Sequence, residues 1–145
     1  MTVDELLARE AIRHTLASYN MAGDRARADE FAEVFTEDGV LETGSFRQEG
    51  RERIRQWMSG AGRDPDAAPR AKAVSFVRHN ITTCQIDITG PDTAKARTYY
   101  VVLTDIGPDH SGYYVDDFRR VGERWLISHR KARLDWRAPE STFGL

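Results

Sequence analysis

The sequence predicts an α+β domain in which helices come first and a strongly curved, mostly antiparallel sheet follows. Three observations carry this prediction. Apolar residues recur at helical spacing in the first half, long strand candidates fill the second half, and only short turns separate those strands. Turns this short leave no room for crossover helices, so neighbouring strands should pair antiparallel.

The first half predicts three helices. The first should cover residues 3–21, whose apolar residues lie on one side, and Gly23 should cap its C-terminus. Asp24 is a good N-cap for a second helix that runs through Phe35 and stops at a turn formed by Asp38 and Gly39.

A short strand at 40–43, a third helix at 51–58 and a Gly- and Pro-containing loop at 59–73 come next. The long strand candidates are residues 74–89, 93–106, 112–121 and 124–136. Strands of this length must bend or bulge, so the sheet should curve around the helices and enclose a pocket.

Composition predicts one globular domain over residues 1–145, with residues 137–145 as a C-terminal tail. Lys and Arg number 21 and Asp and Glu number 23, a balance that argues against a nucleic-acid partner. The single cysteine, Cys84, can form neither an internal disulfide nor a cysteine cluster for a metal. Neither a leader nor a membrane-length apolar run is recognisable, so we expect a cytoplasmic protein with no membrane partner.

His79 is the first candidate for chemistry because it lies between Val77 and Ile81 on one face of a strand. A histidine there is either a hydrogen-bonded core or surface residue, or a general acid or base, since imidazole changes charge near neutral pH. The four histidines have no short ligand spacing, so no metal site and no cofactor are expected. His110 is expected in a turn, and Asp116 among exposed ion pairs.

Three further residues have a structural and a functional interpretation. Asp24 is either a helix cap or a partner of a catalytic group, and Tyr19 is either a core-edge aromatic or a hydrogen-bond donor to substrate. Arg130 shares a strand face with apolar residues, so it needs a partner carboxylate or a bound ligand.

The order of these segments resembles the SnoaL-like branch of the NTF2-like superfamily, and the resemblance covers residues 3–136. The matching stretches are Ala11-Ile12-Arg13 with Tyr19, Gly23-Asp24, Phe35-Thr36-Glu37-Asp38-Gly39-Val40-Leu41, Gly50-Arg51-Glu52-Arg53-Ile54, Val77-Arg78-His79-Asn80, Gly112-Tyr113-Tyr114-Val115-Asp116 and Trp125-Leu126-Ile127-Ser128-His129-Arg130. The resemblance implies a cone in which three N-terminal helices pack into the curved sheet. It does not specify the reaction, because one fold hosts many chemistries.

One subset of that branch, which includes hexachlorocyclohexane dehydrochlorinase, bile-acid dehydratase and scytalone dehydratase, uses a histidine–aspartate dyad without a cofactor. Its pattern matches Asp24 and His79, and members also match Tyr19 and Arg130. These four residues are the predicted catalytic set. The predicted substrate-binding residues are Phe31, Phe35, Trp57, Phe76, Tyr100, Thr104 and Leu134.

The resemblance therefore predicts a cofactor-independent lyase of the dehydratase type, or an isomerase, that acts on a hydrophobic cyclic or polyketide-like small molecule. The alternative is a binding protein without turnover, or an accessory subunit of a larger enzyme. Apolar residues on the sheet face that helices cannot cover predict a homodimer or homotrimer; they are Tyr99, Val101, Leu103, Tyr113 and Val115.

Overall fold

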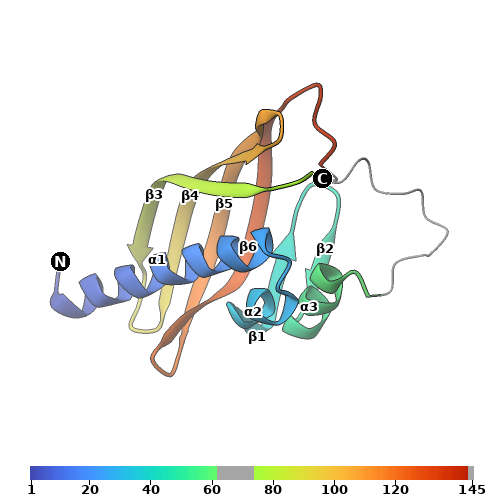
Figure 1. Cartoon of the computed structure of the whole chain (residues 1–145). Helices are drawn as coiled ribbons and strands as arrows, with labels where there is room; N and C mark the ends of the chain where they lie inside the picture. Colours follow the sequence, from blue (N-terminus) through green and yellow to red (C-terminus); the bar gives the residue numbers. More distant parts are fainter. Residues whose placement is uncertain (62–73, 144–145) are drawn as a thin grey trace.

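The computed structural model describes residues 1–61 and 74–143, so most of the loop expected at 59–73 lies outside the described residues. Helices at the N-terminus pack against one curled sheet (Figure 1). The helices are α1 (Val3–Asp24), α2 (Ala28–Glu33) and α3 (Arg51–Ser59). The strands are β1 (Phe35–Glu42), β2 (Arg47–Glu49), β3 (Arg78–Ile88), β4 (Thr93–Thr104), β5 (Gly107–Val121) and β6 (Arg124–Arg137). The predicted fold class is confirmed.

The six strands have the spatial order β2-β1-β6-β5-β4-β3. The strands from β3 to β6 form the expected antiparallel meander, while β1 joins the sheet by pairing parallel with β6. In Figure 1, α1 lies across one face of the meander, and α2 and α3 lie beside β1 and β2. The sheet is therefore mixed but mostly antiparallel.

The end of α1 differs from the sequence expectation. The helix begins with a capping box between Thr2 and Glu5, but it continues past Gly23 and ends at Asp24. Ala26 takes the left-handed conformation with φ 54°, and α2 starts only at Ala28. Asp24 is thus not the N-cap of α2, and its carboxylate is available for another partner.

The region expected to end the second helix is part of β1. Phe35 begins this strand, and Asp38 and Gly39 lie within it rather than in a turn. The pairing register with β6 shifts between Phe35 and Val40, so the strand bulges there. A Cβ on Gly39 would lie 2.9 Å from the Thr36 carbonyl oxygen, so glycine permits a close backbone approach.

The ends of the strands also differ from the sequence expectation. The strand candidates 93–106 and 112–121 placed the turn between β4 and β5 after residue 106, but it is at Asp105 and Ile106, and Gly107 already begins β5 with φ 87°. The Asp105 carboxylate accepts hydrogen bonds from the backbone N–H groups of Ser75 and Phe76. These two donors are then unavailable to the sheet, and β3 starts at residue 78 rather than at 74.

The core divides into two parts. The larger packs α1, α2 and α3 on the sheet through side chains such as Ile12, Phe35 and Ile127. The smaller is formed by Tyr100, Val102 and Tyr114 on the same side of the sheet. No helix within the described residues has the length and apolarity needed to span a bilayer.

Candidate functional site

Asp24 and His79 meet where the end of α1 lies over the start of β3. Nδ1 of His79 is 2.5 Å from Oδ1 of Asp24, and the backbone N–H of His79 donates to Oδ2 at 2.9 Å. The Asp24 side chain is 7% exposed and the His79 side chain is 20% exposed. One carboxylate thus fixes both the backbone and the ring of His79, and leaves Nε2 of that ring for another partner.

A row of aromatic rings continues from His79 along the smaller core. The Tyr100 ring is 6.3 Å from the His79 ring and stacks on Tyr114 at 4.7 Å, and Tyr114 contacts the Tyr19 ring at 5.7 Å, all between centroids. Burial raises the pKa of Tyr100 to about 12, and burial also raises the pKa of Tyr19. These phenols therefore stay protonated at neutral pH and can act as hydrogen-bond donors.

Arg130 lies fully buried and pairs with Asp116. Its Nε and Nη2 groups donate to the two Asp116 oxygens at 2.8 and 2.7 Å. The expectation that Asp116 belongs to an exposed ion pair is wrong, since this carboxylate faces the core. Burial raises the pKa of Asp116 and would lower that of Arg130, but the adjacent Asp116 carboxylate raises the pKa of Arg130 overall.

Arg130 also connects the ion pair to the aromatic row. Its guanidinium carbon lies 4.1 Å from the Tyr19 ring centroid and 3.8 Å from that of Tyr114. Nη1 of Arg130 is buried without a hydrogen-bond partner among the described residues. The structure thus supplies the partner carboxylate that the sequence left as one alternative, and it places Arg130 beside Tyr19.

The structure distributes the predicted substrate-binding residues over different places. Phe31 and Phe35 lie in the main core against the Tyr19 ring, and Trp57 packs against Phe31. The side chains of Phe76 and Leu134 are exposed.

Thr104 and Tyr100 lie on β4, closer to His79. The Thr104 hydroxyl donates to Oδ2 of Asp109 at 2.9 Å, and the Tyr100 hydroxyl donates to the Arg133 carbonyl at 2.8 Å. Gly112 is on β5, which lies between the strand of Tyr100 (β4) and the strand of Arg133 (β6). A Cβ on Gly112 would clash with both the Tyr100 hydroxyl and the Arg133 carbonyl. Glycine therefore permits this cross-strand hydrogen bond.

Sequence reasoning missed a second histidine–carboxylate pair, Asp109 and His110. Nδ1 of His110 is 2.7 Å from Oδ1 of Asp109, and both side chains are almost fully buried. His110 is on β5 and not in a turn, because the β4–β5 turn comes earlier in the chain than expected. The pairing pattern contained the signal: His79 is opposite Val102, and Val102 is opposite His110.

Residues expected to form a free tail cover this second pair. β6 extends through Arg137, and the backbone N–H of Ala138 then donates to the Asp109 carbonyl at 2.8 Å. The Ser141 hydroxyl donates to Oδ1 of Asp109 at 2.6 Å, and the Phe143 ring lies 4.9 Å from the His110 ring. The segment 138–143 is therefore packed against the fold.

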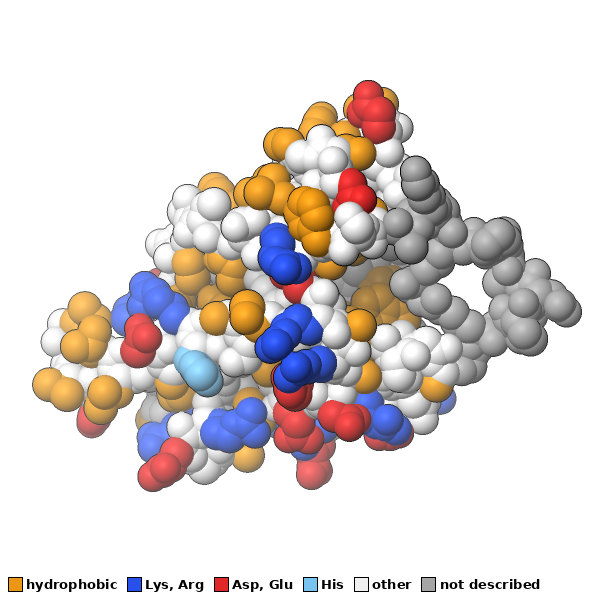
Figure 2. Space-filling view, viewed as in Figure 1, with side chains coloured by type: hydrophobic (Ala, Val, Ile, Leu, Met, Phe, Trp, Pro, Cys, Tyr) orange, Lys and Arg blue, Asp and Glu red, His pale blue; other side chains and the backbone are white. Residues whose placement is uncertain are grey.

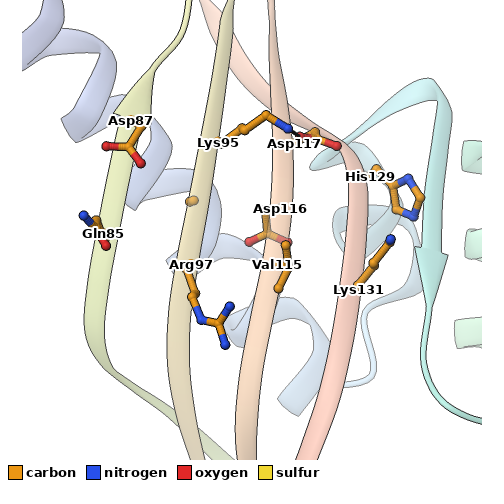
Figure 3. A pocket seen from close by; sticks show the side chains of 10 residues that line it. Gln85, Asp87, Lys95, Arg97, Val115, Asp116, Asp117, His129 and Lys131 are labelled. Carbon is orange, nitrogen blue, oxygen red and sulfur yellow. Dashed lines mark hydrogen bonds and ion pairs between the residues drawn. The ribbon is translucent and has the colours of Figure 1, made fainter.

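Two surface hollows lie away from Asp24 and His79. One, of about 310 Å³, is on the sheet face opposite to α1, where Lys95 pairs with Asp117 beside His129 and Lys131 (Figure 3). The other lies between the N-terminal part of α1 and the β3–β4 turn. Figure 2 shows hydrophobic side chains at that end of α1, in agreement with the exposure of Val3 and Leu7. Over residues 1–61 and 74–143, no three potential metal-ligating side chains cluster.

The SnoaL-like domain family matches residues 4–131, and the chain belongs to this family. The family assignment agrees with the resemblance found in the sequence. A comparison with curated protein sequences found no significant match.

Solved structures share the fold. A protein from Novosphingobium aromaticivorans whose name assigns it to scytalone dehydratase is 20% identical, with 100% of this chain and 93% of that chain covered and a TM-score of 0.79. The hexachlorocyclohexane dehydrochlorinase LinA-type3 from Novosphingobium barchaimii is 15% identical over 99% and 97%, with a TM-score of 0.76. A protein from N. aromaticivorans named as the beta subunit of an aromatic-ring-hydroxylating dioxygenase is 20% identical over 92% and 93%, with a TM-score of 0.74.

Proposed function

We propose that the protein is a cofactor-independent lyase of the dehydratase type, or an isomerase, that acts on a hydrophobic cyclic or polyketide-like molecule. The observation that carries this proposal is the bond between Nδ1 of His79 and Oδ1 of Asp24. A carboxylate on Nδ1 fixes the imidazole tautomer and stabilises the imidazolium that forms when Nε2 accepts a proton. His79 is then the general base, and Asp24 holds it in position.

Proton abstraction next to a carbonyl is the step that both reactions share. A positioned general base contributes roughly 10²–10⁴-fold to such a step. Tyr19 has a raised pKa, so in this proposal its phenol keeps the proton needed to donate to an enolate oxygen. The charge of Arg130 is already balanced by Asp116, so Arg130 contributes mainly by holding Tyr19 through their 4.1 Å contact.

Two of the named relatives support a lyase. One is named as a scytalone dehydratase and another as a dehydrochlorinase, and both names describe eliminations. Identities of 20% and 15% carry the fold and not the reaction, so the proposal depends on the geometry of Asp24 and His79.

The alternative function is binding without turnover, either alone or as an accessory subunit. The positions of the two hollows favour it, because neither is lined by His79 or Asp24. One structural relative is named as a dioxygenase beta subunit. In this alternative the Asp24–His79 bond only joins α1 to β3.

Hydrogen–deuterium exchange separates the two functions. A panel of cyclic β-hydroxy ketones and cyclic β,γ-unsaturated ketones is incubated with the protein in D₂O, and mass spectrometry follows deuterium at the α-carbon while absorbance follows the conjugated enone. Exchange with loss of water supports a dehydratase, and exchange with double-bond migration supports an isomerase. Binding detected by calorimetry with no exchange in any member of the panel would contradict the proposal and favour the binding module.

A further inference from the structure

His79 and His110 are neighbours across three strands, although 31 positions separate them in the sequence. The register puts His79 opposite Val102 and Val102 opposite His110, so the two histidines lie in one row on one face. Their ring centroids are 6.3 Å apart with an interplanar angle of 83°. Each ring is held by a carboxylate at Nδ1, Asp24 for one and Asp109 for the other.

We propose that His110 is a second catalytic residue, whose Nε2 accepts a hydrogen bond from the leaving hydroxyl of the substrate while His79 faces the same oxygen. This inference rests on the proposed function and narrows it. The substrate is an alcohol that loses water, and not a halide or a compound whose double bond only migrates.

The separation of the rings leaves room for one shared oxygen. An imidazole nitrogen lies about 1 Å from its ring centre, so a centroid distance of 6.3 Å brings the two Nε2 atoms no closer than about 4 Å. That distance exceeds a direct hydrogen bond. One oxygen atom can hydrogen-bond to both nitrogens when they lie no more than roughly 5.6 Å apart, which is the span of two hydrogen bonds of about 2.8 Å.

The protonation state of His110 determines whether the substrate oxygen must carry a hydrogen atom. Burial lowers the pKa of His110, and the nearby His79 and Arg137 lower it further, while Asp109 opposes the shift. Burial alone would raise the pKa of Asp109, but hydrogen bonds from Ser141, His110 and Thr104 lower it. His110 is therefore neutral at pH 7, with its proton on Nδ1 toward the Asp109 carboxylate and a lone pair on Nε2. A lone pair accepts from a hydroxyl and repels a halide.

The two histidines then divide the elimination between them. Nε2 of His79 takes the proton from the α-carbon, the electrons of that C–H bond form the double bond, and the C–O bond breaks with its electron pair going to oxygen. The imidazolium of His79 returns its proton to that oxygen, whose own O–H is held by His110. The products are the alkene and one water molecule, and both histidines end as they began.

The different exposure of the two rings indicates from which side a ligand enters. His79 keeps 20% of its side-chain surface exposed and His110 only 2%. A ligand therefore meets His79 first, and His110 lies beneath, supported by Phe143 and by the Ser141 contact to Asp109.

Nitrogen NMR of the full chain labelled with ¹⁵N-histidine tests this proposal without the true substrate. The probes are 2-naphthol, which carries a hydroxyl donor, and 2-methoxynaphthalene, which keeps the oxygen but has no O–H. At pH 7.5 we expect His110 as the Nδ1–H tautomer, an Nε2 resonance that moves on addition of 2-naphthol, and binding of 2-naphthol about tenfold tighter than binding of 2-methoxynaphthalene. A proton on Nε2 of His110, or an Nε2 resonance that 2-naphthol leaves unchanged, would overturn the proposal.

Variants separate this proposal from the proposed function. His110→Asn should remove the tenfold preference for 2-naphthol, while His14→Asn, at an exposed position on α1, should keep it. α-Carbon exchange with loss of water at the wild-type rate in His110→Asn would refute the role of His110 and leave the lyase proposal standing. A hydroxyl-dependent shift of His110 in a protein that exchanges no substrate would leave the His110–hydroxyl contact standing and refute the lyase.

Discussion

Asp24 uses its two oxygens on a single residue, accepting the ring Nδ1–H of His79 at one and the backbone N–H of His79 at the other. The contact joins the last turn of α1 to the second residue of β3, across 55 positions of sequence. A carboxylate that only capped a helix would bond to N–H groups of that helix, whereas both Asp24 oxygens bond to a residue of β3. The variants below distinguish a catalytic role of this pair from a purely structural one.

The first prediction concerns turnover by the pair. His79→Ala should lower turnover by about two to four decades and leave the fold intact, because the proposed base is lost. Asp24→Asn should also lower turnover, since an amide cannot stabilise imidazolium, while its oxygen can still accept the backbone N–H. Rates of α-carbon exchange, with circular dichroism as the folding control, measure both effects.

The double variant decides between the interpretations of Asp24. If the two residues act as a unit, His79→Ala combined with Asp24→Asn should lose little more than His79→Ala alone. Additive losses would show that Asp24 acts through stability and not through His79.

The second prediction concerns the buried ion pair. Arg130→Leu should lower the free energy of unfolding by about 3–5 kcal/mol, because it leaves the Asp116 carboxylate buried and unpaired. Combining it with Asp116→Leu should recover much of that loss. The matched control is Arg119→Leu, which removes an exposed pair with Asp38 and should cost less than about 1 kcal/mol. Equal losses at the two arginines in urea denaturation would contradict this account.

The third prediction concerns pH. Burial lowers the pKa of His110 below the unfolded value of about 6.5, so below that pH the unfolded chain binds more protons than the folded one. The free energy of unfolding should therefore fall as the pH falls from about 6.5 toward the lowered pKa. His110→Asn should show a weaker dependence between pH 7.5 and 5.5, and His14→Asn should match wild type. Identical urea midpoints versus pH for all three proteins would rule out this contribution.

The fourth prediction concerns assembly. Tyr99, Leu103 and Val115 are exposed on the sheet face opposite to α1, which no helix covers among the described residues. Burial of this face in a homodimer or homotrimer removes apolar surface from water. Light scattering should give a multiple of 16.5 kDa, and Val115→Asp should shift the mass toward the monomer. A wild-type mass near 16.5 kDa at micromolar concentration would reject the prediction.

The fifth prediction concerns metals. Three potential metal-ligating side chains do not cluster anywhere in residues 1–61 and 74–143, so exhaustive treatment with EDTA should leave turnover unchanged. Activity that is lost with EDTA and restored by one added metal ion would contradict a mechanism based on Asp24 and His79 alone.

Much of this architecture follows from local pattern, and the differences follow from long-range contacts. Helical periodicity and short turns predict α1, α3 and the meander, because each depends on neighbouring residues. The end of α1 could not be predicted, because Gly23 and Asp24 have good capping chemistry but Asp24 bonds to His79 instead. Phe35 was expected in a helix and lies in β1, whose pairing with a distant strand decides its conformation.

The candidate site shows the same division. The family resemblance is what singled out Asp24 and His79, since each residue alone has an ordinary structural interpretation. Asp116 was expected at the surface because the run Asp116-Asp117-Phe118-Arg119-Arg120 is typical of exposed ion pairs, whereas its partner Arg130 is fourteen positions away. His110 required counting register across two hairpins, and a shift of the β4–β5 turn was enough to hide it.

The parallel pairing of β1 with β6 also has a consequence for the order in which the protein can fold. Residues 35–42 are made early, but their partner strand consists of residues 124–137, so β1 has an open edge through most of synthesis. The backbone N–H of Ile127 donates to the Val34 carbonyl at 2.9 Å, and this contact too exists only when β6 is present. Closing so long a loop comes late and slowly. Until then the apolar face and the unpaired edge of β1 are exposed to other unfinished chains, so we expect aggregation to occur mainly before β6 has been synthesised.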